Sequence, residues 1–279
     1  MRRPSVGRLA VHLVLAIVIL FWLVPALGLL VTSFRTGSAA ATSGWWTEFA
    51  YPQFTSSAYR GAFEQVSLGR GLLNSLLVTI PANVVLVSFA TVVGYVFGRM
   101  RFRGRDVVFM LTIALMALPP QMALGPLFQL FSDLGLTGHY ASMWIFQGGF
   151  VMPLAVLILR NFFASIPDEL FEAAEVDGAG PASTFFAIAL PLALPGILSV
   201  FIFQFIFSWN DLMMPLVLLG ASDKATVTIQ IAGMVGSTTA DNQTLVAASA
   251  IVSVIVPLVV FFALQRYFVR GLMSGAVKG

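Results

Sequence analysis

The 279-residue chain contains no cysteine, only two histidines and few charged residues, which make up 10% of it. The absence of cysteine excludes disulfides, thiolate metal sites and cysteine nucleophiles, and His12 and His139 stand alone, so we expect no metal site. Water-soluble domains carry about a quarter charged residues. Here 58% of the residues are hydrophobic and the mean hydropathy is +0.93. These values exclude a water-soluble fold and predict an all-α protein in a lipid bilayer.

Long apolar stretches set the expected number of membrane crossings. A helix needs about 20 apolar residues to cross the hydrocarbon core. The stretches that meet or approach this length are residues 9–31, 72–97, 107–131, 140–159, 196–219 and 245–264. We therefore expect six transmembrane helices, the first of them retained because it is too long for a signal-peptide core. A shorter run at 185–194 contains Pro191 and Pro195, and we interpret it as an interfacial connection into the fifth helix.

The distribution of Lys and Arg predicts the orientation. Eleven of the 15 basic residues fall in the N-terminal segment, the loops after the second and fourth helices, and the C-terminal tail, and four fall on the opposite side. Because cytoplasmic loops carry the excess of basic residues, both termini are expected in the cytoplasm. The basic residues are scattered rather than gathered on one face, so no nucleic-acid partner is expected.

This topology suggests three parts. Residues 1–69 would hold the first transmembrane helix and an external segment, residues 70–266 a transmembrane core with a cytoplasmic loop at 160–195, and residues 267–279 a cytoplasmic tail. The external segment contains Trp45 and Trp46. Paired tryptophans are typical of the membrane interface, and a docking surface for an external protein is the alternative that composition leaves open.

One cytoplasmic segment, Ser165 to Gly178, is acidic and departs from the positive-inside pattern. Ser165 suits an N-cap, Pro167 a first turn and Gly178 a C-terminal stop, which predicts a short helix over 167–176. Its acidic residues share one arc; they are Asp168, Glu169, Glu172 and Glu175. A helix of about ten residues is marginal alone in water. A basic protein surface is one partner that fits it, and a solvated loop helix is the alternative.

A longer pattern includes this helix. The pattern comprises Glu172, Ala173, Ala174, Gly178, Ile188, Leu190 and Pro191. Its spacing, EAA-x3-G-x9-I-x-L-P, resembles the EAA loop of bacterial ABC importer permeases, with every fixed position filled. Further segments are similar to the carbohydrate-importer branch of that family, and these are Asn74-Ser75, Tyr95, Arg99 to Gly104, Leu134-Gly135-Leu136, Trp209-Asn210-Asp211 and Gly271 to Gly279.

The resemblance implies a type I ABC importer permease fold with six transmembrane helices in a bacterial inner membrane. It implies import of a carbohydrate by alternating access, with a homologous second permease subunit, two ATPase subunits and an extracytoplasmic solute-binding protein. The chain contains no G-x-x-x-x-G-K-[ST] phosphate loop. We therefore expect no enzyme activity and no cofactor on this chain, and expect ATP and Mg on the ATPase subunits.

The resemblance also assigns roles within the loop. Residues 172–178 would form a coupling helix in a cleft of the ATPase, with Glu172 facing a basic residue, Ala173 and Ala174 allowing close approach, and Asp177 preceding the sharp turn at Gly178. Ile188, Leu190 and Pro191 would seat the loop against the membrane helices.

Polar residues inside the apolar stretches suggest a solute path. The principal candidates are Asn83, Gln121, Gln204, Asn210 and Asp211, and Asn74, Gln129 and Gln147 are further ones. Amides donate and accept hydrogen bonds at once, which suits sugar hydroxyls. Interhelical hydrogen bonding is the commoner use of such residues. Asp211 could line the path, cap a helix break ahead of Pro215 or bind the partner permease.

Prolines predict breaks in the third and fourth helices, at Pro119-Pro120, Pro126 and Pro153. Two other protein classes are alternatives. A stand-alone secondary transporter or channel would act without an ATPase. An intramembrane hydrolase would need a general base at membrane depth, where neither histidine lies.

Overall fold

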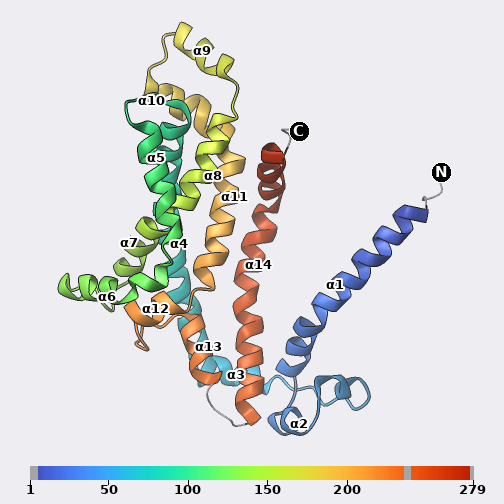
Figure 1. The fold of residues 1–279 in the computed structure, drawn as a ribbon. Coiled ribbons are helices and arrows are strands. Elements are labelled where there is room, and N and C mark those ends of the chain that lie inside the picture. Colours follow the sequence, from blue (N-terminus) through green and yellow to red (C-terminus); the bar gives the residue numbers. More distant parts are fainter. Residues whose placement is uncertain (1–5, 236–239, 277–279) are drawn as a thin grey trace. The chain divides into compact units, whose positions relative to one another are not determined.

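The structure, a computed structural model, describes residues 6–235 and 240–276, and within these ranges it contains helices and no strand (Figure 1). The all-α prediction is therefore confirmed. In chain order the elements are α1 (Val6–Ser33), α2 (Gly37–Thr42), η1 (Trp45–Phe49), α3 (Ser57–Glu64), α4 (Leu68–Arg99), α5 (Arg105–Ala114), η2 (Leu115–Ala117), η3 (Pro120–Ala123), α6 (Leu124–Asp133), α7 (Tyr140–Phe150), α8 (Met152–Ala164), α9 (Asp168–Val176), α10 (Pro181–Thr184), η4 (Phe185–Ala189), α11 (Leu190–Trp209), α12 (Met213–Leu218), α13 (Val227–Val235) and α14 (Ala240–Ala276).

The chain divides into two compact units. The smaller unit comprises residues 1–69 and 230–255, and the larger unit comprises residues 70–229 and 256–279. The candidate coupling loop and the polar residues of the predicted solute path all belong to the larger unit.

Four helices of the described chain are long and apolar enough to cross a membrane on their own, and these are Ala10–Ser33, Leu68–Arg99, Pro181–Trp209 and Asn242–Tyr267. Two further candidates are bent pairs. Arg105–Ala117 and Pro120–Asp133 meet at 84°, and Tyr140–Phe150 and Met152–Ala164 meet at 47°. The first bend lies at Pro119-Pro120 and the second beside Pro153, so these two predicted interruptions are confirmed. The third is wrong, because Pro126 lies in the first turn of α6, which continues to Asp133. Residues 6–235 and 240–276 thus contain four candidate spans, or up to six if each bent pair is one span, as in a multi-pass membrane protein.

The fifth predicted helix differs from the structure at both ends. The run at 185–194 is not a separate connection, because residues Pro181–Trp209 form one continuous helix with a π-helical turn at Phe185–Ala189. Proline interrupts helices in water, but within a membrane helix neighbouring groups can satisfy the carbonyl that it leaves free. At the other end, α11 stops at Trp209 rather than near 219.

The core of the larger unit lies where α4, α8 and α11 pack together. Leu86 and Ala90 of α4, Leu159 and Phe163 of α8, and Ala193 of α11 are all fully buried there. The glycines of α4 permit the close approach to α8. A Cβ atom at Gly94 would lie 2.9 Å from the Cβ of Leu159, and one at Gly98 would lie 3.0 Å from the carbonyl oxygen of Arg160. Small residues spaced four apart are a common device for bringing membrane helices together.

The smaller unit contains the predicted external segment, which folds around one buried arginine. The Arg35 side chain is 2% exposed, and its Nε donates to Oε1 of Glu48, itself 3% exposed, at 2.8 Å. The other guanidinium nitrogens donate to the carbonyl oxygens of Ala39 and Ser43 and to the Ser43 hydroxyl. The backbone N–H of Gln53 and the neighbouring guanidinium of Arg35 lower the pKa of Glu48 from its ordinary value of 4.5. This carboxylate therefore stays charged although it is buried.

Candidate functional site

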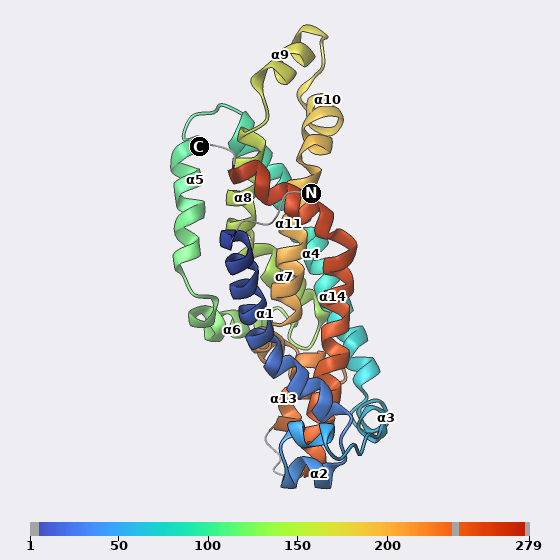
Figure 2. The same ribbon diagram turned by 90° about the vertical axis from the view of Figure 1, so that its right-hand side faces the viewer.

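The acidic loop forms a helix, as predicted. α9 spans Asp168–Val176, and both views show it beyond the ends of α8 and α10 (Figures 1 and 2). Asp168 and Glu169 occupy the first turn, where carboxylates are stabilised by the helix dipole. The predicted N-cap is wrong. Pro167 holds the cap position in an extended conformation, and the Ser165 hydroxyl instead donates to the Phe162 carbonyl at 2.7 Å, at the end of α8.

The end of α9 is fixed by the turn at Gly178. Gly178 has φ of +78°, a conformation that favours glycine, and its N–H donates to the Glu175 carbonyl at 3.0 Å. The next N–H, of Ala179, donates to the Ala174 carbonyl at 2.9 Å. This pair of bonds is the Schellman motif, which satisfies the last carbonyls of a helix. The predicted stop at Gly178 is confirmed.

The two alanines of the EAA pattern have different surroundings. Ala174 is 5% exposed and packs within its own chain, whereas Ala173 is exposed, as are Glu172 and Asp177. Ala173 is therefore the alanine of the pair that is open to solvent. The apolar side chain of Val176 is 88% exposed and that of Leu170 is 43% exposed. The exposed surface of α9 thus combines acidic and apolar side chains.

The second half of the pattern lies where α10 continues through η4 into α11. Ile188 and Leu190 are half-buried and Pro191 is exposed. Ala189, between the first two, is fully buried in the core beside α8. The structure therefore connects the pattern's second half to the packed helices.

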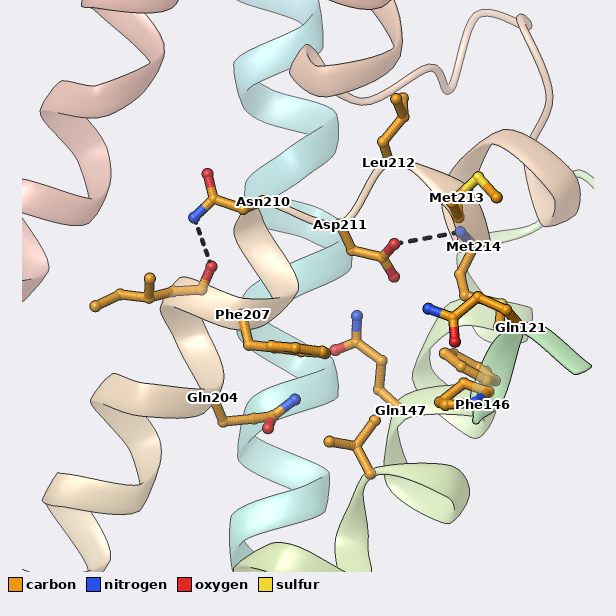
Figure 3. A pocket seen from close by; sticks show the side chains of 13 residues that line it. Gln121, Phe146, Gln147, Gln204, Phe207, Asn210, Asp211, Leu212, Met213 and Met214 are labelled. Atoms are coloured by element: carbon orange, nitrogen blue, oxygen red, sulfur yellow. Dashed lines mark hydrogen bonds between the residues drawn. The ribbon is translucent and has the colours of Figure 1, made fainter. Parts of the chain in front are cut away.

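A cavity of about 520 Å³ opens in the larger unit at three helix breaks (Figure 3). Pro120 follows the break in the α5–α6 pair, Val151 lies in the break between α7 and α8, and Asn210 to Leu212 separate α11 from α12. Interrupted helices at membrane depth are tolerated where they line a cavity, since their free backbone groups need polar neighbours. Four of the five principal solute-path candidates line this cavity, namely Gln121, Gln204, Asn210 and Asp211.

The polar side chains around the cavity differ in how many hydrogen bonds they make within the protein. Asp211 Oδ1 accepts a hydrogen bond of 3.3 Å from the N–H of Met214 in the first turn of α12, which fits one of the three roles expected for this residue, the cap ahead of Pro215. The Asn210 side chain points away from the Asp211 carboxylate, and its amide donates to the Ile206 carbonyl at 2.8 Å (Figure 3). The Gln204 side chain is almost fully buried, and its Nε2 has no hydrogen-bond partner within the described chain.

Gln147 and two aromatic residues complete the cavity lining. Gln147 Oε1 accepts a hydrogen bond of 2.7 Å from the Ser208 hydroxyl. Phe146 and Phe207 also line the cavity and were not anticipated from the sequence. The spacing of Phe207 three residues after Gln204 was the available signal, because such a pair shares one helix face. None of the 13 lining residues is Lys or Arg.

Two other polar candidates lie elsewhere. Asn83 is completely buried and does not line the cavity, and its amide donates to the Thr79 carbonyl at 2.8 Å. Asn74 binds the backbone before α13, donating to the carbonyl oxygens of Asp223 and Ala225 at 2.9 Å each. Both amide nitrogens therefore bind backbone carbonyl oxygens, while the buried Oδ1 of Asn83 has no hydrogen-bond partner among the described residues. Within residues 6–235 and 240–276 no group of three His, Cys, Asp or Glu side chains could hold a metal ion.

The multi-pass helical fold, the exposed loop helix and the cavity at its helix breaks define a membrane transport protein. The family described as "Binding-protein-dependent transport system inner membrane component" matches residues 90–274, and the chain belongs to this family. It is thus a membrane subunit of a transporter complex, and ATP hydrolysis belongs to other subunits.

Curated relatives support this membership. The chain is 40% identical to the osmoprotective compounds uptake permease protein GgtD of Synechocystis sp. over 97% of this chain and 92% of that protein. It is 41% identical to the alpha-glucoside transport system permease protein AglG of Rhizobium meliloti over 82% of this chain and 61% of that protein.

A solved structure supports the fold. The chain resembles a bacterial ABC transporter involved in the import of the acidic polysaccharide alginate, with a TM-score of 0.78 and 23% identity over 96% of this chain and 100% of that chain. The ABC importer permease fold is therefore shown at the level of architecture.

Proposed function

We propose that this chain moves a carbohydrate, such as a sugar, oligosaccharide or related polyol, across a bacterial inner membrane by alternating access. It would act beside a homologous permease subunit, with two ATPase subunits that bind ATP and Mg and an extracytoplasmic solute-binding protein. Support comes from the relatives that handle alpha-glucosides and osmoprotective compounds, and from a cavity that offers amides together with aromatic rings.

The proposed topology has six transmembrane helices, each bent pair counting as one, and cytoplasmic termini. The division expected from the sequence is kept, with a first helix and external segment at 1–69, a core at 70–266 containing the loop 160–195, and a tail at 267–279. The excess of basic residues in the N-terminal segment, the proposed cytoplasmic loops and the tail supports this orientation.

The proposal depends on one observation: α9, which contains the first three residues of the complete EAA pattern, is exposed. Glu172, Ala173 and Asp177 face solvent, so a socket on an ATPase subunit can reach them. The Schellman turn at Gly178 and the seat at Ile188, Leu190 and Pro191 would hold the helix while the ATPase pushes it. In this proposal, ATP binding moves α9 and the movement opens the cavity alternately to each side.

Charge reversal of Glu172 tests this role. In the complex co-expressed with its partner subunits, Glu172→Arg should abolish co-purification of the ATPase subunits and lower uptake by more than about tenfold, since burying an unpaired charge at an interface costs several kcal/mol. Glu64→Arg is the matched control, because Glu64 is an exposed carboxylate at the end of α3, outside the loop. Intact association and uptake in Glu172→Arg would refute the coupling role.

The cargo class is tested by ATPase stimulation. The reconstituted complex with its binding protein is challenged with maltose, sucrose, trehalose and glycerol 3-phosphate in turn. We expect a neutral sugar to stimulate hydrolysis, since the candidate path through Gln121, Gln204, Asn210 and Asp211 contains no cation to pair with a phosphate. Sugar uptake into liposomes by the chain without any ATPase would favour the stand-alone transporter instead.

A further inference from the structure

Arg99, the last residue of α4, makes three contacts with the segment that carries the proposed coupling helix. Its Nη1 donates to the carbonyl oxygen of Ile166 at 3.2 Å, and its Nη2 lies 2.7 Å from Oδ1 of Asp168. The guanidinium carbon also lies 3.8 Å from the centre of the Phe171 ring. The Arg99 side chain thus contacts Ile166 just before α9, and Asp168 and Phe171 within α9.

These contacts need the shape of arginine. The Arg99 side chain is 11% exposed, so it is largely withdrawn from water, while Asp168 is 78% exposed. A guanidinium is planar, and it can stack its face on a ring while its edge donates two separate hydrogen bonds. An ammonium group can approach the ring or the carboxylate but does not reproduce this combined geometry.

The end of α4 that carries Arg99 is itself firmly packed. Gly94 and Gly98 bring α4 against the backbone of α8, as described above. The Tyr95 ring lies between two others, with centroids 5.5 Å from Phe163 at the end of α8 and 4.9 Å from Phe185 in η4. α4 therefore contacts both segments that flank the loop as well as the loop helix.

The opposite end of α4 is bonded to α7, which contributes to the cavity. Trp144 Nε1 donates to the Leu77 carbonyl at 2.9 Å, and the Tyr140 hydroxyl donates to Oδ1 of Asn74 at 2.7 Å. α7 also carries Phe146 and Gln147 of the cavity lining. At 1.5 Å per residue, the 32 residues of α4 span about 48 Å. A single helix thus joins α9 to the helix that lines the cavity.

We propose that Arg99 is a positioning residue that clamps α9 to α4, so that displacement of the coupling helix moves α4 and, through α7, the cavity. This inference rests on the proposed role of α9 as the coupling helix. In this arrangement α4 and α9 move as one body when ATP binds. Without the guanidinium, α9 moves with the ATPase while α4 lags behind it.

Spin labels measure this directly and need no knowledge of the solute. The chain has no native cysteine, so Val92→Cys on α4 and Val176→Cys on α9 provide two exposed attachment points. In the complete complex, electron spin resonance distances between these labels should stay unchanged when ATP is bound and trapped. In the Arg99→Met complex the distance distribution should shift and broaden on ATP binding.

Transport measurements supply the second readout. With maltose as the probe, Arg99→Met should lower uptake per ATP hydrolysed by about tenfold, which corresponds to roughly 1.4 kcal/mol, while the ATPase subunits still co-purify and still hydrolyse ATP. Arg99→Lys should restore part of this ratio. Arg103→Met is the matched control, since it removes an equal charge at an exposed side chain in the loop that follows α4.

The outcomes separate the clamp from the proposed function. Equal label behaviour in Arg99→Met and Arg103→Met would overturn the clamp, as would a label distance that changes with ATP in the unaltered complex. If the Arg99→Met complex does not assemble, Phe171→Leu decides the question with the same labels, because it removes the ring and keeps an apolar contact. Loss of ATPase binding in Glu172→Arg together with normal labels in Arg99→Met would remove the clamp and leave the coupling helix in place.

Discussion

The chain contains two arginine–carboxylate pairs of similar length in very different surroundings. Arg35 and Glu48 meet at 2.8 Å and are both nearly inaccessible, whereas Arg99 and Asp168 meet at 2.7 Å with the carboxylate 78% exposed. The first pair is completed by backbone carbonyls and by a backbone N–H of its own segment. The second joins α4 to α9, whose sequence positions lie about 70 residues apart.

The Arg35–Glu48 pair stabilises one local conformation, whereas the Arg99–Asp168 pair connects two helices. A buried pair with all its partners present fixes one local conformation, because removing either member leaves a charge without water. An exposed pair exchanges partners with water at little cost. The Arg35 pair therefore specifies the fold of the segment from Phe34 to Thr55. At Arg99, by contrast, the stacked ring and the backbone carbonyl carry the attachment.

The largest expected effect follows removal of Arg35. Arg35→Met leaves Glu48 buried and uncompensated, and we expect the external segment to lose about 3–5 kcal/mol of stability. Backbone hydrogen exchange over residues 34–55 would report this loss. Arg60→Met, at an exposed arginine in α3, is the matched control. Unchanged protection in Arg35→Met would show that the pair does not organise the segment.

Acid should weaken the same pair by a smaller amount. Because the pKa of Glu48 is lowered in the folded protein, its contribution is fully present above the ordinary value of 4.5 and is lost as the pH falls through the lower, folded value. The protection factors of the segment, which are corrected for the intrinsic pH dependence of amide exchange, should therefore stay constant from neutral pH down to about pH 5 and fall below it. Glu48→Gln should remove most of this acid dependence. A loss that begins well above pH 5 and persists in Glu48→Gln would point to another group.

The smallest effect is expected at the exposed pair. Asp168→Asn keeps an oxygen that can accept from Arg99, and surface ion pairs contribute about 0–1 kcal/mol. Uptake per ATP should therefore fall by less than about fivefold, far less than in Arg99→Met. The measurement is maltose uptake against ATP hydrolysis in the reconstituted complex. Equal losses in both variants would show that the ion pair, rather than the stacking contact, carries the clamp.

Local patterns predicted much of the loop. The helix over 167–176 and its stop at Gly178 depend on residues that lie within one or two turns of each other, so spacing alone identifies them. The position of Ala174 depends on how the whole loop packs, and the sequence could not place it. Arg99 was noted only as part of a similar segment, because its partners at 166–171 become neighbours only after α4 and α8 have packed.

The membrane helices show a similar division. Apolar length and Pro119-Pro120 were sufficient to predict the candidate spans and the sharpest bend. The helix Pro181–Trp209 was divided incorrectly because Pro191 and Pro195 were interpreted as they would be in water. Polar residue types predicted the five polar residues among the 13 that line the cavity, but the direction of each side chain depends on tertiary packing. Asn83 and Asn210 accordingly satisfy nearby carbonyls of their own helices.

Three helix breaks meet at one cavity, and in the proposed solute path this arrangement separates the position of the cavity from its chemistry. Backbone interruptions at Pro120, Val151 and Asn210 to Leu212 determine where the cavity lies, and the side chains between them determine the chemistry of its surface. Exchanging Gln121 or Phe207 would therefore change the chemistry of the cavity surface while the backbone around it keeps its position. Under the proposed function, a change of cargo therefore needs different side chains at the cavity surface and no change in the arrangement of the helices.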